Sequence, residues 1–361
     1  QSKKVWIADQ FTPAQLELED GIIKEIYPYN EKEVTKDYGD LRILPGFIDI
    51  HCHGAYGFDT NDADPEGLRK WAKGIVDEGV TSFLATTLTQ SEEVLTNAVS
   101  NVAKVVEEGY EGAEILGIHF EGPYLNKAHK GAQPEEYCVK PNIEQFKRYQ
   151  KAAHGLIKYI TMAVENDEDY TLTKYCSQNI GHSNATYEQA VQAYAHGARS
   201  MTHVYNAMTP FTHRANGLVG GALRIRNMYG EIICDGNHST LAALNNFFTS
   251  KGPDYSIMIT DSLMCKGFPV GTKFDFGGQE VVIYPDGSAH LVEAGNLAGS
   301  TLNVNKGLKI LIEDALVPVN YAINACTSNP ARCLHVADRK GTIGVGYDAD
   351  LVILDRDYEV V

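Results

Sequence analysis

The sequence is poor in the features that mark membrane, secreted and nucleic-acid-binding proteins. It contains no apolar run of about eighteen residues, so it predicts no membrane-spanning helix. Its seven cysteines are dispersed without a Cys-x-x-Cys pair, which favours reduced thiols over a disulfide framework. Basic residues number only 31 against 47 acidic ones, and the net charge of −16 disfavours nonspecific binding to nucleic acid. Gln1–Trp6 is too polar and short for a signal peptide, so we expect a cytoplasmic protein without membrane or nucleic-acid partners.

Hydrophobic residues make up 43% of the 361 positions, enough for one large domain and a smaller one. In the centre of the chain, short β-branched runs alternate with amphipathic stretches, which predict helices. Asp64 before Pro65, and Thr186 three residues before Gln189, are helix-start signals. The predicted strands are Phe47–Ile50, Thr81–Thr86, Ile115–Phe120, Ile157–Val164, Asn179–Gly181, Ser200–Thr202, Glu231–Cys234 and Ser256–Thr260.

Repeated strand–helix–strand units pair their strands in parallel through right-handed crossovers. Eight such units over roughly 250 residues match the size of a TIM barrel, with a doubly wound open sheet as the alternative. The predicted fold class is therefore α/β, with a (β/α)8 barrel over residues 45–335.

The two ends of the chain differ from this centre, because both consist of strand-like runs. Neither 1–44 nor 336–361 is large enough to bury a core alone, so we expect them to pair into one small β-sandwich domain. A further β segment, 273–291, contains the turn signal Pro285-Asp286-Gly287 and predicts a hairpin insertion near the mouth of the barrel.

Potential metal ligands follow five of the predicted strands. His51 and His53 come directly after the first strand, and residues i and i+2 of a strand point to the same side. Taken alone, this pair could equally be two polar residues at a strand end. However, Glu121, His182 and His203 end the third, fifth and sixth strands, on the rim where TIM-barrel active sites form.

These residue types suit a borderline divalent ion such as zinc, iron or manganese. Glu121, His182 and His203 would supply three protein ligands and leave a position for water. His51 and His53 could complete a second, adjacent metal position.

Asp261 ends the eighth predicted strand and is the candidate general base. A carboxylate beside a bound metal can take a proton from water and return it to a leaving amine. A helix N-cap or a fifth ligand are the other interpretations of this residue. His119 lies inside its strand, before the strand end at Glu121, and is expected to support the ligands rather than to bind metal.

Several longer strings resemble the amidohydrolase superfamily, and within it the N-acetylglucosamine-6-phosphate deacetylases. The likeness covers nearly the whole chain, up to the closing stretch Gly341–Leu351. The Glu-Gly-Pro-Tyr-Leu-Asn and His-Val-Tyr-Asn-Ala-Met strings are the most specific to these deacetylases. The matching strings are Leu44–Gly54, Gly117–Asn126, Gly181–Thr186, Thr202–Met208, Cys234–His238 and Ile259–Asp261.

The resemblance implies roles for individual residues. It implies that Glu121, His182 and His203 bind the main metal, with Zn²⁺ or Fe²⁺ expected in one or two positions per subunit. It implies that Asp261 is the acid/base and that Gln133, where some relatives have histidine, donates to the acetyl carbonyl, with His129 as the alternative. The implied substrate contacts are Asn206, Ala207, Arg214, His238, Leu297 and Ala298. It also implies a homodimer in which His238 reaches the neighbouring site.

The expected reaction is therefore hydrolysis of the acetamide of N-acetyl-D-glucosamine 6-phosphate by a metal-dependent deacetylase. Two alternatives remain open at this point. One is another amidohydrolase that acts on a cyclic amide or an amine. The other is a non-catalytic sugar-phosphate binding protein on the same barrel.

Overall fold

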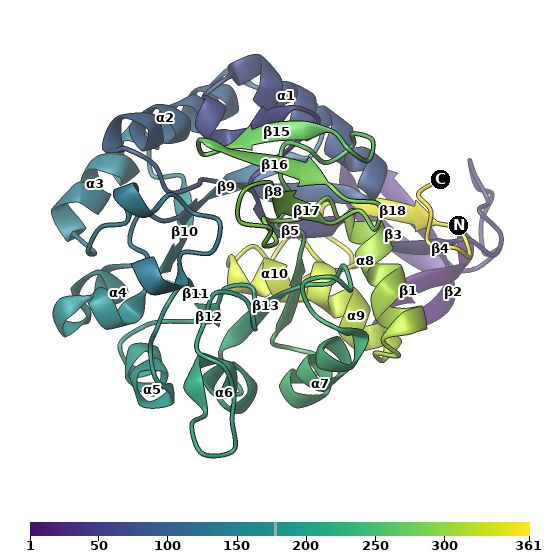
Figure 1. Ribbon diagram of the computed structural model, residues 1–361. Helices are drawn as coiled ribbons and strands as arrows, with labels where there is room; N and C mark the ends of the chain where they lie inside the picture. Colours follow the sequence, from purple (N-terminus) through teal and green to yellow (C-terminus); the bar gives the residue numbers. More distant parts are fainter. Residues whose placement is uncertain (177–178) are drawn as a thin grey trace.

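Eight parallel strands form the centre of the protein, whose computed structural model describes residues 1–176 and 179–361 (Figure 1). Each strand pairs with the next one in the chain, which confirms the barrel and excludes the open doubly wound sheet. All eight predicted strands are present, with ends shifted by a few residues. They are β5 (Phe47–Cys52), β8 (Val80–Thr86), β9 (Glu114–Glu121), β10 (Ile157–Met162), β11 (Asn179–Ile180), β12 (Ser200–Met201), β13 (Tyr229–Ile233) and β14 (Ser256–Ile259).

The last strand, β14, returns to the first, β5, just where both end. The Asp261 amide donates to the His51 carbonyl at 2.8 Å, and the His53 amide donates to the Ser262 carbonyl at 2.8 Å. Inside the barrel, the Thr260 hydroxyl donates to the buried Asp49 carboxylate at 2.6 Å. This seam brings the ends of strands one and eight side by side, so the His51/His53 pair meets Asp261.

Helices surround the barrel and begin at the caps that the sequence predicts. The Asp64 side chain accepts from the Glu66 amide, and Thr186 with Gln189 forms a complete capping box. The helices are α1 (Pro65–Gly74), α2 (Glu92–Glu108), α3 (Ile143–Ala152), α4 (Thr171–Tyr175), α5 (Tyr187–Ala195), α6 (Gly217–Arg224), α7 (Leu241–Lys251), α8 (Val304–Lys309), α9 (Val319–Cys326) and α10 (Ser328–Cys333). Among the described residues, no helix is both long and apolar enough to cross a bilayer.

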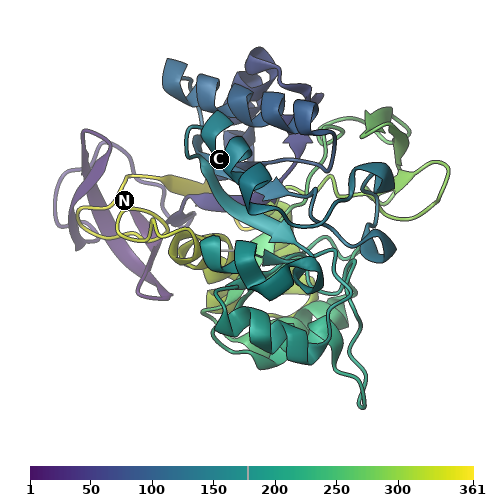
Figure 2. The same ribbon diagram turned by 90° about the vertical axis from the view of Figure 1, so that its left-hand side faces the viewer.

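The two chain ends meet in one five-stranded sheet to one side of the barrel (Figures 1 and 2). Its order is β18 (Leu351–Leu354), β4 (Arg42–Pro45), β1 (Ser2–Ile7), β2 (Gln10–Glu19) and β3 (Ile22–Pro28). Its apolar core comes from both ends of the sequence and comprises Val5, Ala14, Ile23, Ile43 and Ile343. The two ends are therefore joined as predicted, while the exact division at residues 44/45 and 335/336 stays a prediction.

The predicted insertion near the barrel mouth is a three-stranded antiparallel sheet, formed by β15 (Lys273–Phe276), β16 (Gln279–Ile283) and β17 (Ala289–Leu291). Pro285-Asp286-Gly287 lies in the turn between β16 and β17, as expected. Two short paired strands, β6 (Gly54–Ala55) and β7 (Phe58–Asp59), follow the first barrel strand. The insertion covers part of the rim on which the candidate ligands lie.

A buried ion pair holds the loop that follows β14. Lys266 is fully buried, and its ammonium donates to Glu78 at 2.8 Å. The Tyr56 hydroxyl donates to the other Glu78 oxygen at 2.8 Å. The carboxylate thus has two donors, and the loop carrying Asp261 is fastened to the 3-10 helix Ile75–Glu78 that follows α1.

Candidate active site

The five predicted metal ligands and Asp261 converge at the carboxyl ends of the strands, although they are spread over more than two hundred positions. Glu121 is central. Its Oε1 lies 3.4 Å from the His182 Nε2 and 3.5 Å from the His203 Nε2, and its Oε2 lies 3.3 Å from the His53 Nε2. Asp261 Oδ1 lies 3.2 Å from the His53 Nε2.

Two adjacent groups of three ligand atoms result from this arrangement. One comprises Glu121, His182 and His203, and the other comprises His51, His53 and Asp261; in each, the ligand atoms lie within 4.8 Å of one another. Glu121 touches both groups, because its Oε1 also lies 3.5 Å from the His51 Nε2. The geometry could therefore hold one or two ions.

The polar atoms of these groups fit a cation. The Nδ1 atoms of His182 and His203 face the carbonyls of His129 and Asn206 at 2.9 and 3.2 Å. If both Nδ1 atoms donate, two Nε2 lone pairs face each other at 3.1 Å, an arrangement that a shared cation stabilises. His51 Nε2 and Glu121 Oε1 are also buried without a hydrogen-bond partner among the described residues.

Backbone conformation at the ligand positions is unusual. His182, His203 and Asp261 have φ values of +47°, +27° and +50°, in a region that residues other than glycine rarely occupy. Such strain persists only where the surrounding structure enforces it, and it is concentrated at functional sites. The tight turns aim these three side chains back over the barrel rather than outward along the strands.

Several carboxylates and imidazoles of the two ligand groups shift one another's pKa values. Burial would lower the pKa of His53, but Asp261 and Glu121 outweigh it and raise the pKa to about 9. Burial would raise the pKa of Asp261, but His51 and His53 lower it to about 2. Burial also opposes the shift of Glu121, whose pKa lies well below its usual range because of the His51 charge and the neighbouring His182. A metal ion that binds to His53 therefore competes with the proton on this ring.

We expect metal binding to weaken as the pH falls. The raised pKa of His53 means that its ring is mostly protonated below about pH 9, and a ligating nitrogen must lose that proton. Between pH 8.5 and 6.5, the apparent affinity should fall about tenfold per pH unit for each proton displaced. Calorimetry of metal-stripped protein in buffers of different ionisation enthalpy measures the proton count. Heats that do not depend on the buffer would contradict this prediction.

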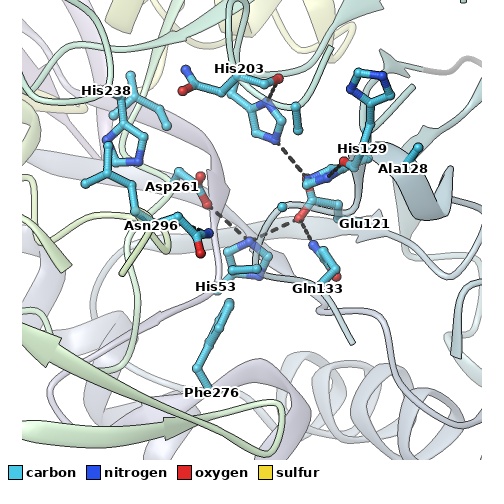
Figure 3. A pocket seen from close by; sticks show the side chains of 18 residues that line it. His53, Glu121, Ala128, His129, Gln133, His203, His238, Asp261, Phe276 and Asn296 are labelled. Atoms are coloured by element: carbon cyan, nitrogen blue, oxygen red, sulfur yellow. Dashed lines mark hydrogen bonds and ion pairs between the residues drawn. The ribbon is translucent and has the colours of Figure 1, made fainter. Parts of the chain in front are cut away.

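A cavity of about 390 Å³ opens directly above the cluster (Figure 3). His53, Glu121, His182, His203 and Asp261 line it, while His51 lies deeper. Predicted substrate contacts that reach it are Gln133, Asn206, Ala207, His238 and Leu297. Residues that line it but were not singled out from the sequence include Ile233, Phe276 and Asn296. Phe276 belongs to the β15–β17 insertion, which the sequence places near the barrel mouth without indicating which of its side chains faces the cavity.

Three predicted substrate residues are placed differently from the expectation. His238 lines the cavity of its own chain, where its Nδ1 lies 2.7 Å from Asp235, so it is available to this cavity and not only to a neighbouring one. Ala298 does not line the cavity; it packs in the apolar core beneath the insertion. Arg214 does not line it either, and it lies on the exposed loop before α6, which projects from the body in Figures 1 and 2. Histidine and arginine are residue types that suit a phosphate, but the sequence does not show which chain supplies His238 or Arg214 to a given cavity.

Gln133 is held in place at both ends of its amide. Its Nε2 donates to Glu121 at 2.7 Å, and its Oε1 accepts from the Thr89 amide at 2.8 Å. One amide hydrogen remains for a ligand in the cavity. His129 also lines the cavity, but its ring nitrogen faces Asn184 at 2.9 Å.

Two carboxylates that sequence reasoning left without a role support the site from behind. Glu165 accepts from Asn126, Ser183 and the Asn184 amide, which ties the turn at His182 to the neighbouring loop. Glu231 lies beneath the cluster and contacts His51. A charged residue inside the predicted apolar strand 231–234 was the available signal for Glu231.

The chain matches a protein-family model described as the amidohydrolase family over residues 42–360. It is 41% identical over 342 residues to an N-acetylglucosamine-6-phosphate deacetylase of Bacillus subtilis (strain 168), covering 92% of this chain and 85% of that protein. It is also 32% identical over 360 residues to an N-acetylgalactosamine-6-phosphate deacetylase of Escherichia coli O157:H7, covering 98% and 93% of the two chains.

A solved structure shares the fold throughout. A variant of N-acetyl-D-glucosamine-6-phosphate deacetylase from Mycobacterium smegmatis, in complex with N-acetyl-D-glucosamine 6-phosphate, superposes with a TM-score of 0.93. The two chains are 26% identical, and the match covers 99% of this chain and 95% of that one. The likeness thus extends over both the barrel and the small sheet.

Proposed function

The chain belongs to the amidohydrolase family, and we propose that it hydrolyses N-acetyl-D-glucosamine 6-phosphate to D-glucosamine 6-phosphate and acetate. One observation carries the chemistry: the carboxylate–histidine groups and Asp261 line the same cavity as His238 and Asn206. Similarity to deacetylases over nearly the whole chain supports the choice of substrate. The reaction belongs to amino-sugar breakdown.

Members of this family are divalent-metal enzymes, and the residues present fit such an ion. Glu121, His182 and His203 would hold it, with a second position at His51 and His53 beside Asp261. Nitrogen and carboxylate donors suit Zn²⁺ or Fe²⁺, and Cys52 between the two histidines points away from the cluster toward the carbonyls of Asp49 and Leu84. A bound ion would acidify a water molecule and polarise the amide carbonyl.

Asp261 is the proton carrier in this proposal. Its carboxylate takes a proton from the attacking water, whose oxygen adds to the acetyl carbon. The carbon–nitrogen bond then breaks, and Asp261 delivers the proton to the sugar nitrogen, so that acetate and the amine leave. The free amide hydrogen of Gln133 donates to the acetyl oxygen, where negative charge develops.

The sugar phosphate requires local donors, because the net charge of the chain repels an anion. The Asn206 Nδ2 is buried and has no partner among the described residues, and it lines the cavity. The Asn206 backbone amide already donates to the His203 carbonyl, so the backbone contribution falls to Ala207. For His238, burial opposes protonation but Asp235 outweighs it and raises the pKa, which favours an imidazolium facing the phosphate.

No lysine or arginine lines the cavity within the part of the chain that the structure describes. Arg214 is exposed and makes no hydrogen bond or ion pair with any of those residues, and Phe211 on the same loop is 54% exposed. We therefore propose a homodimer in which the loop before α6 brings Arg214 to the partner's cavity. A planar guanidinium there would bind the phosphate through paired hydrogen bonds.

Mixing two defective variants tests this shared site. His238→Ala and Arg214→Ala should each raise KM about 10- to 100-fold, since a hydrogen bond to a charged group contributes about 1.5–3 kcal/mol. In mixed dimers, one cavity keeps His238 and receives an intact Arg214. A fraction of sites with wild-type KM should therefore appear after subunit exchange, measured by acetate release at low substrate. Mixtures that behave as the average of the two variants would contradict the exchange of Arg214.

The proposed reaction is tested by acetate release from metal-stripped protein, followed by restoration of individual metals. We expect no release without metal and recovery with Zn²⁺ or Fe²⁺. N-acetylgalactosamine 6-phosphate and unphosphorylated N-acetylglucosamine should be poorer substrates. Release from a cyclic amide instead would indicate another amidohydrolase, and sugar-phosphate binding without release would indicate a binding protein. We also propose a cytoplasmic location, where the seven free cysteines would stay reduced.

A further inference from the structure

Glu231 on β13 lies inside the barrel beneath the ligand groups, where it is fully buried. Its Oε2 lies 3.0 Å from the Nδ1 of His51 on the first strand, β5, from which β13 is separated by β14. Its Oε1 accepts from the Asn179 Nδ2 at 2.7 Å. These are its two side-chain donors among the described residues, and no lysine or arginine pairs with it.

The contact with Glu231 specifies which nitrogen of His51 faces the cavity. A carboxylate only accepts hydrogen bonds, so the His51 Nδ1 must donate. In the neutral ring, the Nε2 then carries a lone pair, and it is the atom that faces Glu121 and Asp261 at 3.5 Å each. This is the tautomer that a metal ligand requires.

His51 differs in this respect from the other three histidines of the ligand groups, His53, His182 and His203. The Nδ1 atoms of His182 and His203 face uncharged backbone carbonyls. The Nδ1 of His53 is buried without a partner among the described residues. Among the four histidines of the ligand groups, as the structure describes them, His51 is the one whose Nδ1 contacts a carboxylate, and donation to a carboxylate makes the opposite ring nitrogen a stronger electron donor.

A third group of possible ligands, His51, His119 and Glu231, lies at this depth. It is not a further metal position, because both ring nitrogens of His119 are engaged, by the Ile50 carbonyl at 2.9 Å and by the Thr161 hydroxyl at 2.7 Å. The buried charge of Glu231 therefore remains to be balanced through His51.

We propose that Glu231 is a positioning residue that fixes His51 as an Nε2 donor and thereby controls occupancy of the metal position formed by His51, His53 and Asp261. The position at Glu121, His182 and His203 does not depend on it. The inference rests on the proposed metal-dependent function. Metal content is measured without substrate, however. The inference about Glu231 can therefore fail while the deacetylase proposal stands, and the deacetylase proposal can fail while the inference about Glu231 stands.

The test compares wild-type protein with Glu231→Gln, which keeps the shape but removes the charge. Metal per chain is measured by mass spectrometry after dialysis against buffered Zn²⁺. We expect wild type to hold two ions. The affinity of Glu231→Gln for the second ion should be 10- to 100-fold weaker, so the variant should hold one ion at Zn²⁺ concentrations that still saturate wild type. Asp167→Asn is the matched control, since Asp167 is buried and accepts from the start of α4 but touches no imidazole. It should hold two ions.

A double-mutant cycle separates positioning from general damage. His51→Gln should lose the same ion, and adding Glu231→Gln to it should change metal content no further. Equal tight binding of two ions by wild type and Glu231→Gln, or additive losses in the cycle, would overturn the proposal. If Glu231→Gln does not fold, ¹⁵N-histidine spectra of the wild-type metal-loaded protein decide: a protonated His51 Nδ1 supports it, and a protonated Nε2 overturns it.

Discussion

Replacement of Asp261 by asparagine should leave a protein that binds metal and sugar phosphate but has lost about a thousandfold or more of its kcat. The side chain keeps its size at the cavity floor, and the neighbouring ligands stay in place. Asparagine cannot accept the proton of the attacking water or return one to the sugar nitrogen, and general acid–base steps contribute about 10²- to 10⁴-fold. Acetate release gives kcat, while calorimetry gives the affinity for N-acetylglucosamine 6-phosphate.

The matched control is Asp275→Asn on β15, an exposed carboxylate next to the cavity-lining Phe276. It removes one negative charge near the rim without touching the ligand groups, and we expect kcat within about twofold of wild type. Turnover of Asp261→Asn near the wild-type value would remove Asp261 from the mechanism. Loss of both metal and turnover would instead assign Asp261 to ion binding alone.

The largest effect on stability is expected at the Lys266–Glu78 pair. Lys266→Met leaves the Glu78 carboxylate buried with the Tyr56 hydroxyl as its remaining side-chain donor. Removal of one partner of a buried pair typically lowers the free energy of unfolding by about 3–5 kcal/mol. Denaturant unfolding of the metal-loaded protein measures the loss. Activity should fall as well, since the loop that follows Asp261 is fastened through this lysine.

Two further variants identify the cause. Lys266→Met combined with Glu78→Leu removes both charges and should recover most of the lost stability. Lys273→Met breaks the exposed pair with Glu280, whose side chains are 54% and 51% exposed, and should cost less than about 1 kcal/mol. If the double variant is as unstable as Lys266→Met, the loss comes from packing rather than from an unpaired charge.

Most of the barrel could be predicted from the sequence because its signals are local. Buried parallel strands read as short β-branched runs, and helix caps such as Asp64 and Thr186 mark where each strand–helix unit turns. The ligands then followed from topology: parallel strands end on one rim, so polar residues after different strands must approach one another. This is why Glu121 and His203, which are 82 positions apart in the sequence, could be grouped.

What could not be predicted depends on contacts without a local pattern. The loop before α6 has no periodicity, so the sequence did not show that Arg214 projects from the body while His238 stays in its own cavity. Glu231 was missed because a single carboxylate in an apolar strand does not indicate its partner. The role of Glu231 follows from its contact with His51, 180 positions away. The burial of Ala298 depends on how the insertion packs on the rim.

At the left-handed turns of His182, His203 and Asp261, the residues that the proposed catalysis needs are not the residues that would make the fold most stable. At each of them, glycine would satisfy the backbone better by about 1–3 kcal/mol. In a lineage that no longer needs to process amino sugars, we therefore expect glycine to accumulate at these three positions, which would raise stability and abolish activity. A screen that selects only for thermal stability should enrich the same glycine substitutions. A screen that also selects for release of the amino-sugar product should remove them.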